Sequence, residues 1–312
     1  MEQNILLSIQ CLVYNHESYL RQCLDGFIMQ KTNFNYEVVV HDDASTDNSA
    51  SIIREYARRY PKLIKPIYES ENLYSRVGNK ISFIINEKCS GKYIALCEGD
   101  DYWTDPLKLQ KQVDFLEANL GYSMCFHNAI EHYEFGEKPD RIFSNVRNDD
   151  YTGLDIYKRW IVPTASVVLR RSVFLSSIYK QAISNEKFIY GDILLFLSCA
   201  NVGMLRGMSD VMSVYRRHQD SFTFKDRYNI SLKLRIHDLY IYKTFGCAYK
   251  KASKKIYARN CINACFLYSL LHPEIKTRYD LLFEVLRITP VNAFLYFSKA
   301  LMRYIKKRTS LG

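Results

Sequence analysis

The sequence has no Cys-x-x-Cys pair, no glycine-rich phosphate loop and no uninterrupted apolar run of about 18 residues. The first absence argues against a structural zinc site, because such sites usually use paired cysteines. The second argues against dinucleotide-dependent dehydrogenases and P-loop nucleoside triphosphatases, whose motifs GxGxxG and GxxxxGK[ST] are missing. The third argues against a membrane-spanning helix. The first residues, Met-Glu-Gln-Asn, also lack the basic segment of a signal peptide.

Nine cysteines are scattered singly, several of them inside apolar runs, where a thiol behaves as a small hydrophobic group. This usage favours a reducing compartment, and we therefore expect a cytoplasmic protein. Hydrophobic residues make up 48% and charged residues 24% of the 312-residue chain. This balance is typical of soluble globular proteins and excludes disorder, collagen and coiled coil as the overall class.

The positive net charge of +10 is concentrated at the C-terminal end. Residues 1–225 carry 26 Lys and Arg against 28 Asp and Glu, a net charge of −2, whereas residues 226–312 carry 17 against 5, a net charge of +12. We therefore predict a near-neutral domain over 1–225 and a separate basic region over 226–312 that has different partners.

Strand-like and helix-like segments alternate along the first hundred residues. Short β-branched or apolar runs are typical of buried parallel strands, and apolar residues spaced three and four apart predict helices between them. We predict strands at 6–13, 36–41, 64–68 and 93–97 and helices at 17–29, 49–60 and 80–89. Repeated units of this kind indicate an α/β fold with a mostly parallel sheet covered on both faces.

The middle of the chain continues this pattern less regularly. Asp105-Pro106 predicts a helix start, since Asp caps helices and Pro suits the first helical position, and this helix should run to about residue 119. Residues 128–163 are polar and irregular, and we predict a surface loop or lid there. The remaining predictions are strands at 123–127, 166–169 and 211–217, a helix at 193–199, and basic helices from 226 onward.

Carboxylates follow two of the predicted strands and precede one predicted helix. They are Asp42-Asp43, Asp100-Asp101 and Asp192. In open parallel sheets, ligands bind beyond the carboxyl ends of the strands. Because a basic phosphate loop is missing, clustered carboxylates indicate a divalent cation, Mg²⁺ or Mn²⁺, held together with substrate phosphates. Two of the groups also have a structural interpretation: a turn with a helix cap for Asp42-Asp43, and an ordinary helix N-cap for Asp192.

The order of these motifs resembles the family 2 glycosyltransferases of GT-A fold. The resemblance rests on Val-Tyr-Asn at 13–15, Val-Val-His-Asp-Asp-Ala-Ser-Thr-Asp at 39–47, and Glu-Gly-Asp-Asp-Tyr-Trp at 98–103 with Asp-Pro-Leu-Lys-Leu at 105–109. It covers about residues 4–225, and the run 98–108 is its most specific part. It implies a Rossmann-like nucleotide-diphospho-sugar transferase domain, with a mixed, mostly parallel sheet and flanking helices, followed by the basic helical region.

The resemblance also implies roles for individual residues. Asp43 looks like the uracil-binding carboxylate, with Tyr14 near the same pocket. Asp100 and Asp101 look like the DxD-type pair, in which Asp101 holds the cation and Asp100 faces the ribose or a metal-bound water. Asp192, in Tyr-Gly-Asp at 190–192, lies where inverting members carry the general base.

A later segment, Tyr-Arg-Arg-His at 215–218 followed by Ser221, resembles a family segment near the diphosphate. It implies that His218 completes the metal shell or contacts phosphate and that Arg216 helps to neutralise it. Two features depart from the family pattern. The QxxRW motif of processive synthases is absent, which argues against a processive polymerase, and Gly191 stands where an acidic residue is commoner.

The basic end lies outside the resemblance. Residues 279–308 mix apolar and aromatic residues with Lys and Arg, which suits either a helix on an anionic membrane surface or a helical appendage packed on the catalytic domain. Nucleic acid is not an expected partner, because no nucleic-acid-binding motif accompanies the basic residues.

We therefore predict an inverting, metal-dependent hexosyltransferase of family 2 that moves one sugar from a UDP-sugar to an acceptor hydroxyl. The expected acceptor is a glycan or lipid-linked glycan of surface polysaccharide biosynthesis at the cytoplasmic face of the membrane. Two alternatives stay open. One is a nucleotidyltransferase, although residues 6–17 lack its glycine-rich basic loop, and the other is a non-catalytic nucleotide-sugar-binding protein of an assembly complex.

Overall fold

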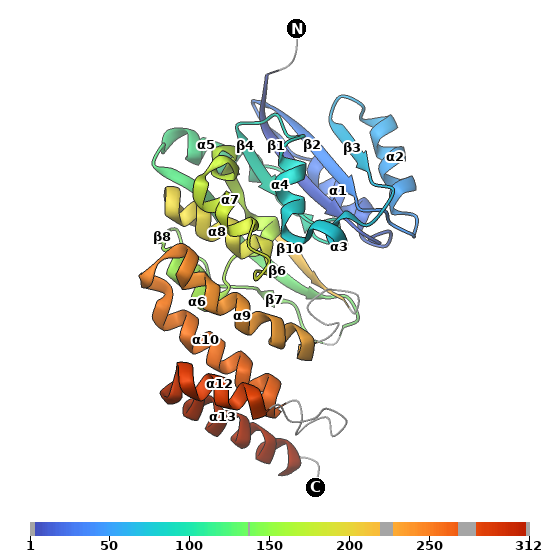
Figure 1. Cartoon of the computed structure of the whole chain (residues 1–312). Coiled ribbons are helices and arrows are strands. Elements are labelled where there is room, and N and C mark those ends of the chain that lie inside the picture. The colour runs from blue at the N-terminus through green and yellow to red at the C-terminus, as the bar shows by residue number, and fades with distance from the viewer. Residues whose placement is uncertain (1–3, 137, 219–226, 268–278, 310–312) are drawn as a thin grey trace. The chain divides into compact units, whose positions relative to one another are not determined.

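A computed structural model describes residues 4–136, 138–218, 227–267 and 279–309 (Figure 1). Its contacts divide the chain into two compact units. The first comprises Met1–Ser184 and Tyr190–His218 and contains the sheet, and the second comprises Asn185–Ile189 and Gln219–Gly312. The predicted boundary at 225/226 lies outside the described residues.

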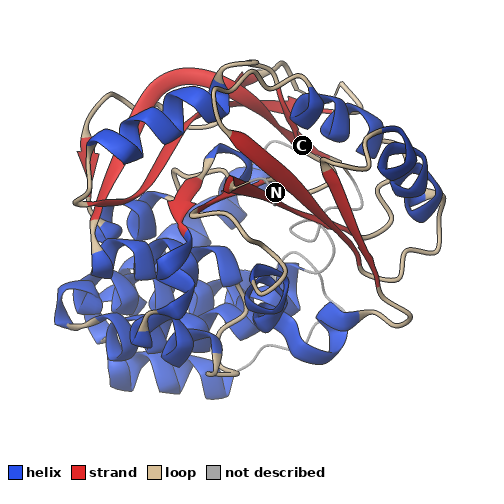
Figure 2. Cartoon of the chain, turned by 90° about the horizontal axis from the view of Figure 1, so that it is seen from above, coloured by secondary structure: helices blue, strands red, loops and turns tan. Residues whose placement is uncertain are grey.

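The first unit is built on one curved sheet (Figure 2). The strand order is β3-β2-β1-β4-β9-β6-β10-β5, with β7 paired to β6 and β8 paired to β10. Neighbours among β1 to β4 are parallel, as are β6 and β10, whereas β5, β7, β8 and β9 pair antiparallel. The strands are β1 (Ile5–Val13), β2 (Asn35–Asp42), β3 (Ile64–Tyr68), β4 (Tyr93–Leu96), β5 (Tyr102–Trp103), β6 (Tyr122–Tyr133), β7 (Arg141–Ile142), β8 (Asp150–Tyr151), β9 (Val168–Arg170) and β10 (Met204–Arg217).

Helices of the first unit cover both faces of this sheet. They are α1 (Leu20–Ile28), α2 (Ser49–Arg59), α3 (Leu73–Val77), α4 (Ile81–Asn86), α5 (Lys108–Ala118), α6 (Gly153–Arg159), α7 (Ser177–Ile183) and α8 (Gly191–Val202). Successive side chains of strand β1 point to opposite faces of the sheet. Leu7 and Ile9 pack in one core with residues of α1, α2 and α5. Ser8 and Gln10 face the other side, where Gln10 Nε2 donates to the carbonyl of Ser82 in α4 at 2.8 Å. The predicted α/β sheet, mostly parallel and covered on both faces, is therefore confirmed.

The predicted loop or lid over 128–163 is wrong. Strand β6 continues to Tyr133, and β7, β8 and α6 also lie in this range. The strand was not predicted because it contains polar residues. These residues are buried and hydrogen-bonded to other protein groups. Asn128 Nδ2 donates to the carbonyl of Val146 at 2.8 Å, and Glu131 accepts from Arg141 and Arg217 at 2.5 and 2.7 Å.

The predicted start of helix α5 at Asp105-Pro106 is two residues too early. Helix α5 begins at Lys108, and Asp105 accepts from the backbone N–H of Leu107 at 2.8 Å in the turn before it. Asp105 also pairs with Lys111 of α5 at 2.8 Å. Its carboxylate therefore stabilises the approach to the helix and not the first helical turn.

Apart from the segment Asn185–Ile189 and short connections, the described part of the second unit is helical. Its helices are α9 (Arg227–Phe245), α10 (Lys250–Ile262), α12 (Tyr279–Ile288) and α13 (Pro290–Thr309). Tyr257, Cys261 and Val285 are among the buried residues of its own core, which is separate from the cores of the sheet unit. Within the described ranges, no helix combines the length and the apolar character that a membrane span requires.

All nine cysteines lie in the described ranges and none forms a disulfide. Every one except Cys247 is buried, in agreement with the expectation that they serve as small core residues.

Candidate active site

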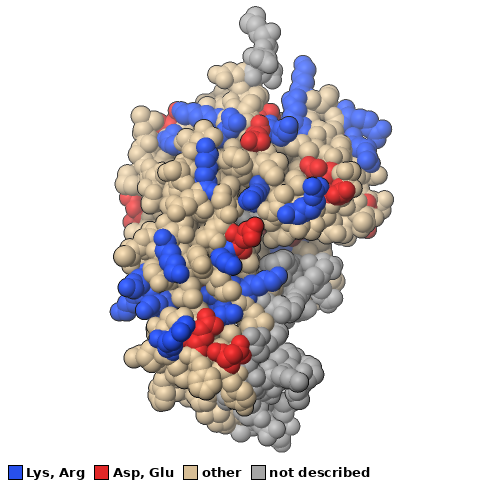
Figure 3. All heavy atoms as spheres, viewed as in Figure 1, with Lys and Arg blue, Asp and Glu red and all other residues tan. Residues whose placement is uncertain are grey.

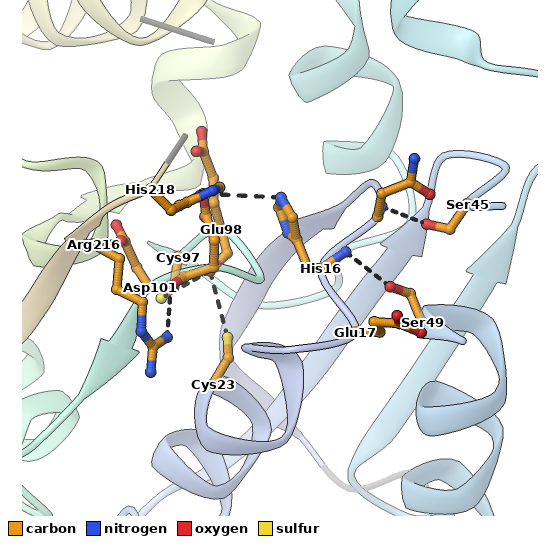
Figure 4. Close-up of polar contacts among 12 residues, drawn as sticks. His16, Glu17, Cys23, Ser45, Ser49, Cys97, Glu98, Asp101, Arg216 and His218 are labelled. Carbon is orange, nitrogen blue, oxygen red and sulfur yellow. Dashed lines mark hydrogen bonds and ion pairs between the residues drawn. The ribbon is translucent and has the colours of Figure 1, made fainter. Parts of the chain in front are cut away.

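The candidate residues follow strands that end at one edge of the sheet. Strands β2, β1 and β4 are adjacent and parallel. Strand β10 runs in the same direction, because β9 is antiparallel to both β4 and β6, and β6 is parallel to β10. The C-terminal ends of β1, β2, β4 and β10 therefore lie at this carboxyl edge, where open α/β sheets bind ligands (Figure 4).

The loop after β1 is hydrogen-bonded to the loop after β2 along its length. The N–H of Asn15 donates to Ser45 Oγ at 3.0 Å, and Asn15 Oδ1 accepts from the N–H of Thr46 at 2.8 Å. The N–H of His16 donates to Ser49 Oγ at 2.9 Å. Asn15 has a left-handed backbone with φ of 58°, a conformation that Asn adopts more readily than most residues. We call this pair of segments, residues 15–17 and 45–49, the coupled loops.

Asp43 lies next to the coupled loops and binds a short helix. It is buried, and its two carboxylate oxygens accept from the N–H groups of Leu73 and Tyr74 at 2.5 and 3.0 Å, at the start of α3. Each oxygen keeps a second lone pair, so the carboxylate can still accept from a ligand. Tyr14 is 46% exposed on the neighbouring loop. The roles of Asp43 and Tyr14 in binding uracil stay a prediction.

The acidic loop, residues 98–101, follows β4 and packs tightly against the end of β1. The N–H of Gly99 donates to the carbonyl of Leu12 at 2.8 Å. A Cβ atom at Gly99 would lie 2.9 Å from both His16 Nδ1 and Val13 Cγ2. Glycine is therefore required here, since any side chain would push the acidic loop away from β1.

Asp100 lies between two histidines. Its Oδ2 is 3.0 Å from His218 Nε2 and 3.9 Å from His16 Nε2. Burial would raise the pKa of Asp100, but His16 and His218 together hold it below its usual value. Its other oxygen, Oδ1, is buried without a hydrogen-bond partner among the described residues.

Asp101 has the opposite electrostatic character. It is 2% exposed, and its Oδ1 accepts from the backbone N–H of Arg216 at 2.9 Å. Burial raises the pKa of Asp101 well above its usual value, and the neighbouring negative charge of Asp100 raises it further. A positive charge placed beside the pair would favour the ionised carboxylate.

Arg216 is a buried clamp on the acidic loop. One guanidinium nitrogen donates to the carbonyl of Asp100 at 2.6 Å, and another donates to the side chain of Gln22. Its Nε forms an ion pair with Glu134 at 2.6 Å, and its guanidinium stacks 4.4 Å from the ring centre of Tyr102. These contacts show that Arg216 positions the acidic loop. Its predicted contact with a diphosphate stays a prediction, and Ser221 of the same motif lies outside the described residues.

The residues of the acidic loop fit a divalent cation only in part. Within the described ranges, no cluster of three or more His, Cys, Asp or Glu side chains has the arrangement of a complete metal site. Mg²⁺ and Mn²⁺ are commonly bound by one or two carboxylates plus substrate phosphates, so a complete protein cage is not required. The unpartnered Oδ1 of Asp100 and the destabilised charge of Asp101 both suit a cation, and His218 contacts the carboxylate of Asp100.

Asp192 stands in the first turn of α8, and its Oδ1 accepts from the N–H of Ile193 at 2.8 Å. Burial raises the pKa of Asp192 to about 6. The pKa of Glu98 rises to about 8, through desolvation and the charges of Asp100 and Asp192. Asp192 also contributes to the raised pKa of Tyr74, after desolvation and Glu98. The structure therefore brings Asp192 within electrostatic range of the acidic loop and of α3.

Three residues of this region were not predicted. His16 Nε2 lies 3.9 Å from Asp100, and the Tyr19 ring packs 4.8 Å from the ring of His218. Burial raises the pKa of Tyr74, and the negative charges of Glu98 and Asp192 raise it further. A signal existed for His16, because it follows a predicted strand at the edge where ligands bind. No local signal marked Tyr74, since its helix lies in a segment that has no predicted element.

Beneath the acidic loop, Trp103 is held by a buried lysine. Trp103 Nε1 donates to the carbonyl of Ala165 at 2.9 Å, and Lys108 Nζ lies 4.0 Å from the ring centre. Lys108 is fully buried and donates to Gln112 Oε1 at 2.8 Å. Burial lowers the pKa of Lys108 to about 7. The amine is therefore largely uncharged above neutral pH.

We expect Lys108→Met to change how stability depends on pH. Between pH 7 and 10.5 the unfolded chain binds a proton at Lys108 that the folded protein has lost, so the native protein gains stability as pH rises. The unfolding free energy of the native protein should gain about 2 kcal/mol on that of Lys108→Met between pH 7 and 9. Chemical denaturation at both pH values measures this difference.

Lys111→Met is the matched control, because Lys111 lies one turn further along α5 and has a raised pKa from its hydrogen bonds with Asp105 and Asp210. Its charge does not change in this pH interval, so its pH profile should run parallel to that of the native protein. Parallel profiles for Lys108→Met as well would show that Lys108 keeps an ordinary pKa.

Comparison with known proteins identifies the family. The model of Glycosyl transferase family 2 matches residues 8–176, more than half of the chain. The chain belongs to glycosyltransferase family 2. The predicted family membership is thus confirmed, and it covers the coupled loops and the acidic loop.

Curated relatives agree with this assignment. This family 2 glycosyltransferase is 38% identical over 212 residues to the uncharacterized protein Rv1520 of Mycobacterium tuberculosis, covering 68% of this chain and 59% of that protein. It is 28% identical over 215 residues to the putative glycosyltransferase EpsE of Bacillus subtilis, covering 69% of this chain and 73% of EpsE. The chain thus spans about three-fifths of the length of its mycobacterial relative.

Solved structures confirm the GT-A fold. TarS of Staphylococcus aureus in complex with UDP matches with a TM-score of 0.63 at 16% identity, over 97% of this chain and 88% of TarS. The mannosyltransferase PcManGT of Pyrobaculum calidifontis, in complex with GDP-Man and Mn²⁺, matches with a TM-score of 0.55 at 14% identity, over 98% of this chain and 90% of that protein. At these identities the likeness concerns the fold alone.

Proposed function

We propose that this family 2 glycosyltransferase transfers one hexose from a UDP-sugar to an acceptor hydroxyl, with inversion at the anomeric carbon and with the help of a divalent cation. The observation that carries the proposal is the meeting of Asp100, Asp101 and Asp192 around one sheet edge, with pKa shifts in different directions. Groups whose environments separate their pKa values are suited to different chemical roles.

The donor's nucleotide is assigned to the coupled loops. Asp43 is held in place by two backbone N–H groups and keeps free lone pairs, which suits it to accept a hydrogen bond from the N–H of uracil. Tyr14 is exposed beside it and can stack on the base. Asp100 faces the ribose or a metal-bound water. The UDP and UDP-GlcNAc complexes of TarS support this choice of nucleotide.

The leaving diphosphate is assigned to the acidic loop. Mn²⁺ or Mg²⁺, when bound there, supplies Lewis-acid stabilisation of the negative charge on the departing nucleoside diphosphate. Asp101 would hold the cation, and His218 would complete the shell or contact phosphate. Arg216 fixes the acidic loop through the carbonyl of Asp100 and adds positive charge near the diphosphate. The Mn²⁺ complex of PcManGT supports a cation in this fold.

Asp192 is proposed as the general base. A pKa of about 6 leaves the carboxylate ionised near neutral pH and basic enough to take the proton of the acceptor hydroxyl as this attacks the anomeric carbon. The first turn of α8 fixes its backbone, and its hydrogen bond with the N–H of Ile193 orients one oxygen.

The proposed acceptor is a glycan or lipid-linked glycan of surface polysaccharide biosynthesis, reached at the cytoplasmic face of the membrane. Relatives support this class: a putative teichuronic acid biosynthesis glycosyltransferase, TuaG of Bacillus subtilis, is 23% identical over 220 residues. In this proposal residues 1–225 are the catalytic domain, and residues 226–312 are an appendage for the membrane surface or the acceptor.

Isothermal titration of UDP with and without Mn²⁺ tests the proposal. We expect Mn²⁺ to tighten UDP binding at least about tenfold, since the cation joins the diphosphate to the acidic loop. GDP titrated in parallel should bind more weakly, because Asp43 is matched to uracil. Binding that is indifferent to both the metal and the base would overturn the donor and cation assignments and would favour a non-catalytic protein.

A further inference from the structure

The last helix of the second unit has two apolar faces. On one face Ala293 and Ala300 are buried in the core of the helical unit, and Tyr296 and Phe297 pack against it. On the other face apolar residues recur at helical spacing and are all exposed: Val291, Phe294, Leu295, Leu301, Met302 and Ile305. One hundred degrees per residue places these two sets on opposite sides of α13.

The exposed set is too apolar for an ordinary solvent-facing helix. Val291 is 81% exposed and Phe294 is 74% exposed. The preceding helix α12 adds Phe283, which is 71% exposed, and Leu286. On the face drawn in Figure 3, the surface over α13 is largely free of charged side chains. A concentration of exposed apolar residues of this kind marks a surface that binds a membrane or another protein.

The charges around this surface restrict what that body can be. Helix α13 contains five basic residues and no acidic one, as its sequence PVNAFLYFSKALMRYIKKRT shows. Among them Lys299 and Arg303, one turn apart and both exposed, flank the exposed apolar set. An anionic body therefore complements the surface. A second copy does not, because pairing two such helices would bring basic residues together.

We infer that the exposed face of α13, continued by Phe283 and Leu286 of α12, is a docking surface for an anionic lipid bilayer. A helix that combines an apolar face containing Phe and Leu with flanking Lys and Arg lies in the plane of the headgroups, with its apolar side chains among the acyl chains. Lys299 and Arg303 then reach the anionic headgroups. This inference rests on the helical unit alone and holds whether or not the catalytic proposal is correct.

Vesicle flotation with the full chain tests this surface. The native protein should float with phosphatidylcholine vesicles that contain phosphatidylglycerol and bind pure phosphatidylcholine far more weakly. High salt should release it, since screening shortens the reach of the headgroup charges. Lys299→Ala with Arg303→Ala should weaken binding about thirtyfold, and Phe294→Ser with Met302→Ser should weaken it by at least as much.

Matched controls carry the same changes on the sheet unit. Leu120→Ser with Leu175→Ser removes exposed apolar side chains there, and Lys62→Ala with Lys88→Ala removes exposed charges there. Both control pairs should float like the native protein. UDP binding, measured on every variant, separates loss of this surface from loss of the fold or of the donor site.

Native protein that ignores phosphatidylglycerol would overturn the inference, as would variants of α13 that still float. A concentration-dependent dimer in analytical ultracentrifugation, abolished by Phe294→Ser with Met302→Ser, would instead assign the face to a second copy.

Discussion

Asp192→Asn is expected to lower kcat about a thousandfold, within the usual range for the loss of a general base. Asn keeps the shape of the side chain and can still accept from the N–H of Ile193, but it cannot take a proton from the acceptor. Donor binding should be unchanged, because Asp192 is assigned to the acceptor side. Steady-state kinetics with a UDP-sugar and an acceptor that the native protein uses would measure kcat, and UDP titration would measure donor binding.

The pH profile gives a second and independent test of the same residue. With a pKa of about 6, Asp192 is ionised above that value and protonated below it. We expect kcat to rise through pH 6 and then level off, whereas the residual activity of Asp192→Asn should lack this rise. Asp114→Asn, on the exposed side of α5, is the control and should keep the native profile. Full activity in Asp192→Asn would show that the base is a different residue, even with the fold correct.

Asp101→Asn is expected to lower activity as much as Asp192→Asn does, but it should not lower the stability of the metal-free protein. Its pKa is raised, so above the usual carboxyl pKa the folded protein without metal must keep a proton on Asp101 that the unfolded chain has lost, and this lowers its stability. Replacing this carboxyl with an amide should leave the metal-free protein as stable or more stable. Activity should fall at least about a thousandfold, because the cation stabilises the leaving group by several kcal/mol.

Thermal and chemical unfolding with ligands would separate these two effects. At a hundred times the dissociation constant, Mn²⁺ and UDP together should raise the native unfolding free energy by about 2.7 kcal/mol, and this gain should vanish in Asp101→Asn. Asp105→Asn is a suitable control, since Asp105 belongs to the same motif but pairs with Lys111 outside the acidic loop. A native-like metal response in Asp101→Asn would remove Asp101 from the cation site.

The parallel strands of the sheet unit were predictable because their signal is local. Strands β1, β2 and β4 contain apolar or β-branched runs that are buried on both faces, a pattern that few other structures produce. Strand β3, at the edge of the sheet, is only partly buried. The carboxylates that follow them could be placed at one sheet edge by the same logic, because parallel strands end together. Asp43, Asp100 and Asp101 do follow β2 and β4, which end at this edge, and their roles stay predictions.

What could not be predicted depends on partners distant in the chain. Helix α3 begins where the N–H groups of Leu73 and Tyr74 meet the carboxylate of Asp43, thirty residues earlier. The second half of β6 carries polar residues such as Asn128, whose side chain is hydrogen-bonded in the core to the backbone of Val146 and Ser209. The sequence alone would predict an exposed side chain for Lys108. In the structure this side chain is buried against the ring of Trp103 and donates to the side-chain amide of Gln112.

The coupled loops have a consequence for redesign. Asn15, Ser45 and Thr46 exchange hydrogen bonds between two segments that are separated by a helix and a strand in the sequence. Neither segment can be replaced alone without leaving unpaired donors and acceptors on the other. A chimera meant to alter donor preference would therefore have to take both segments from the same parent. In natural relatives, residues of the two segments should likewise vary together.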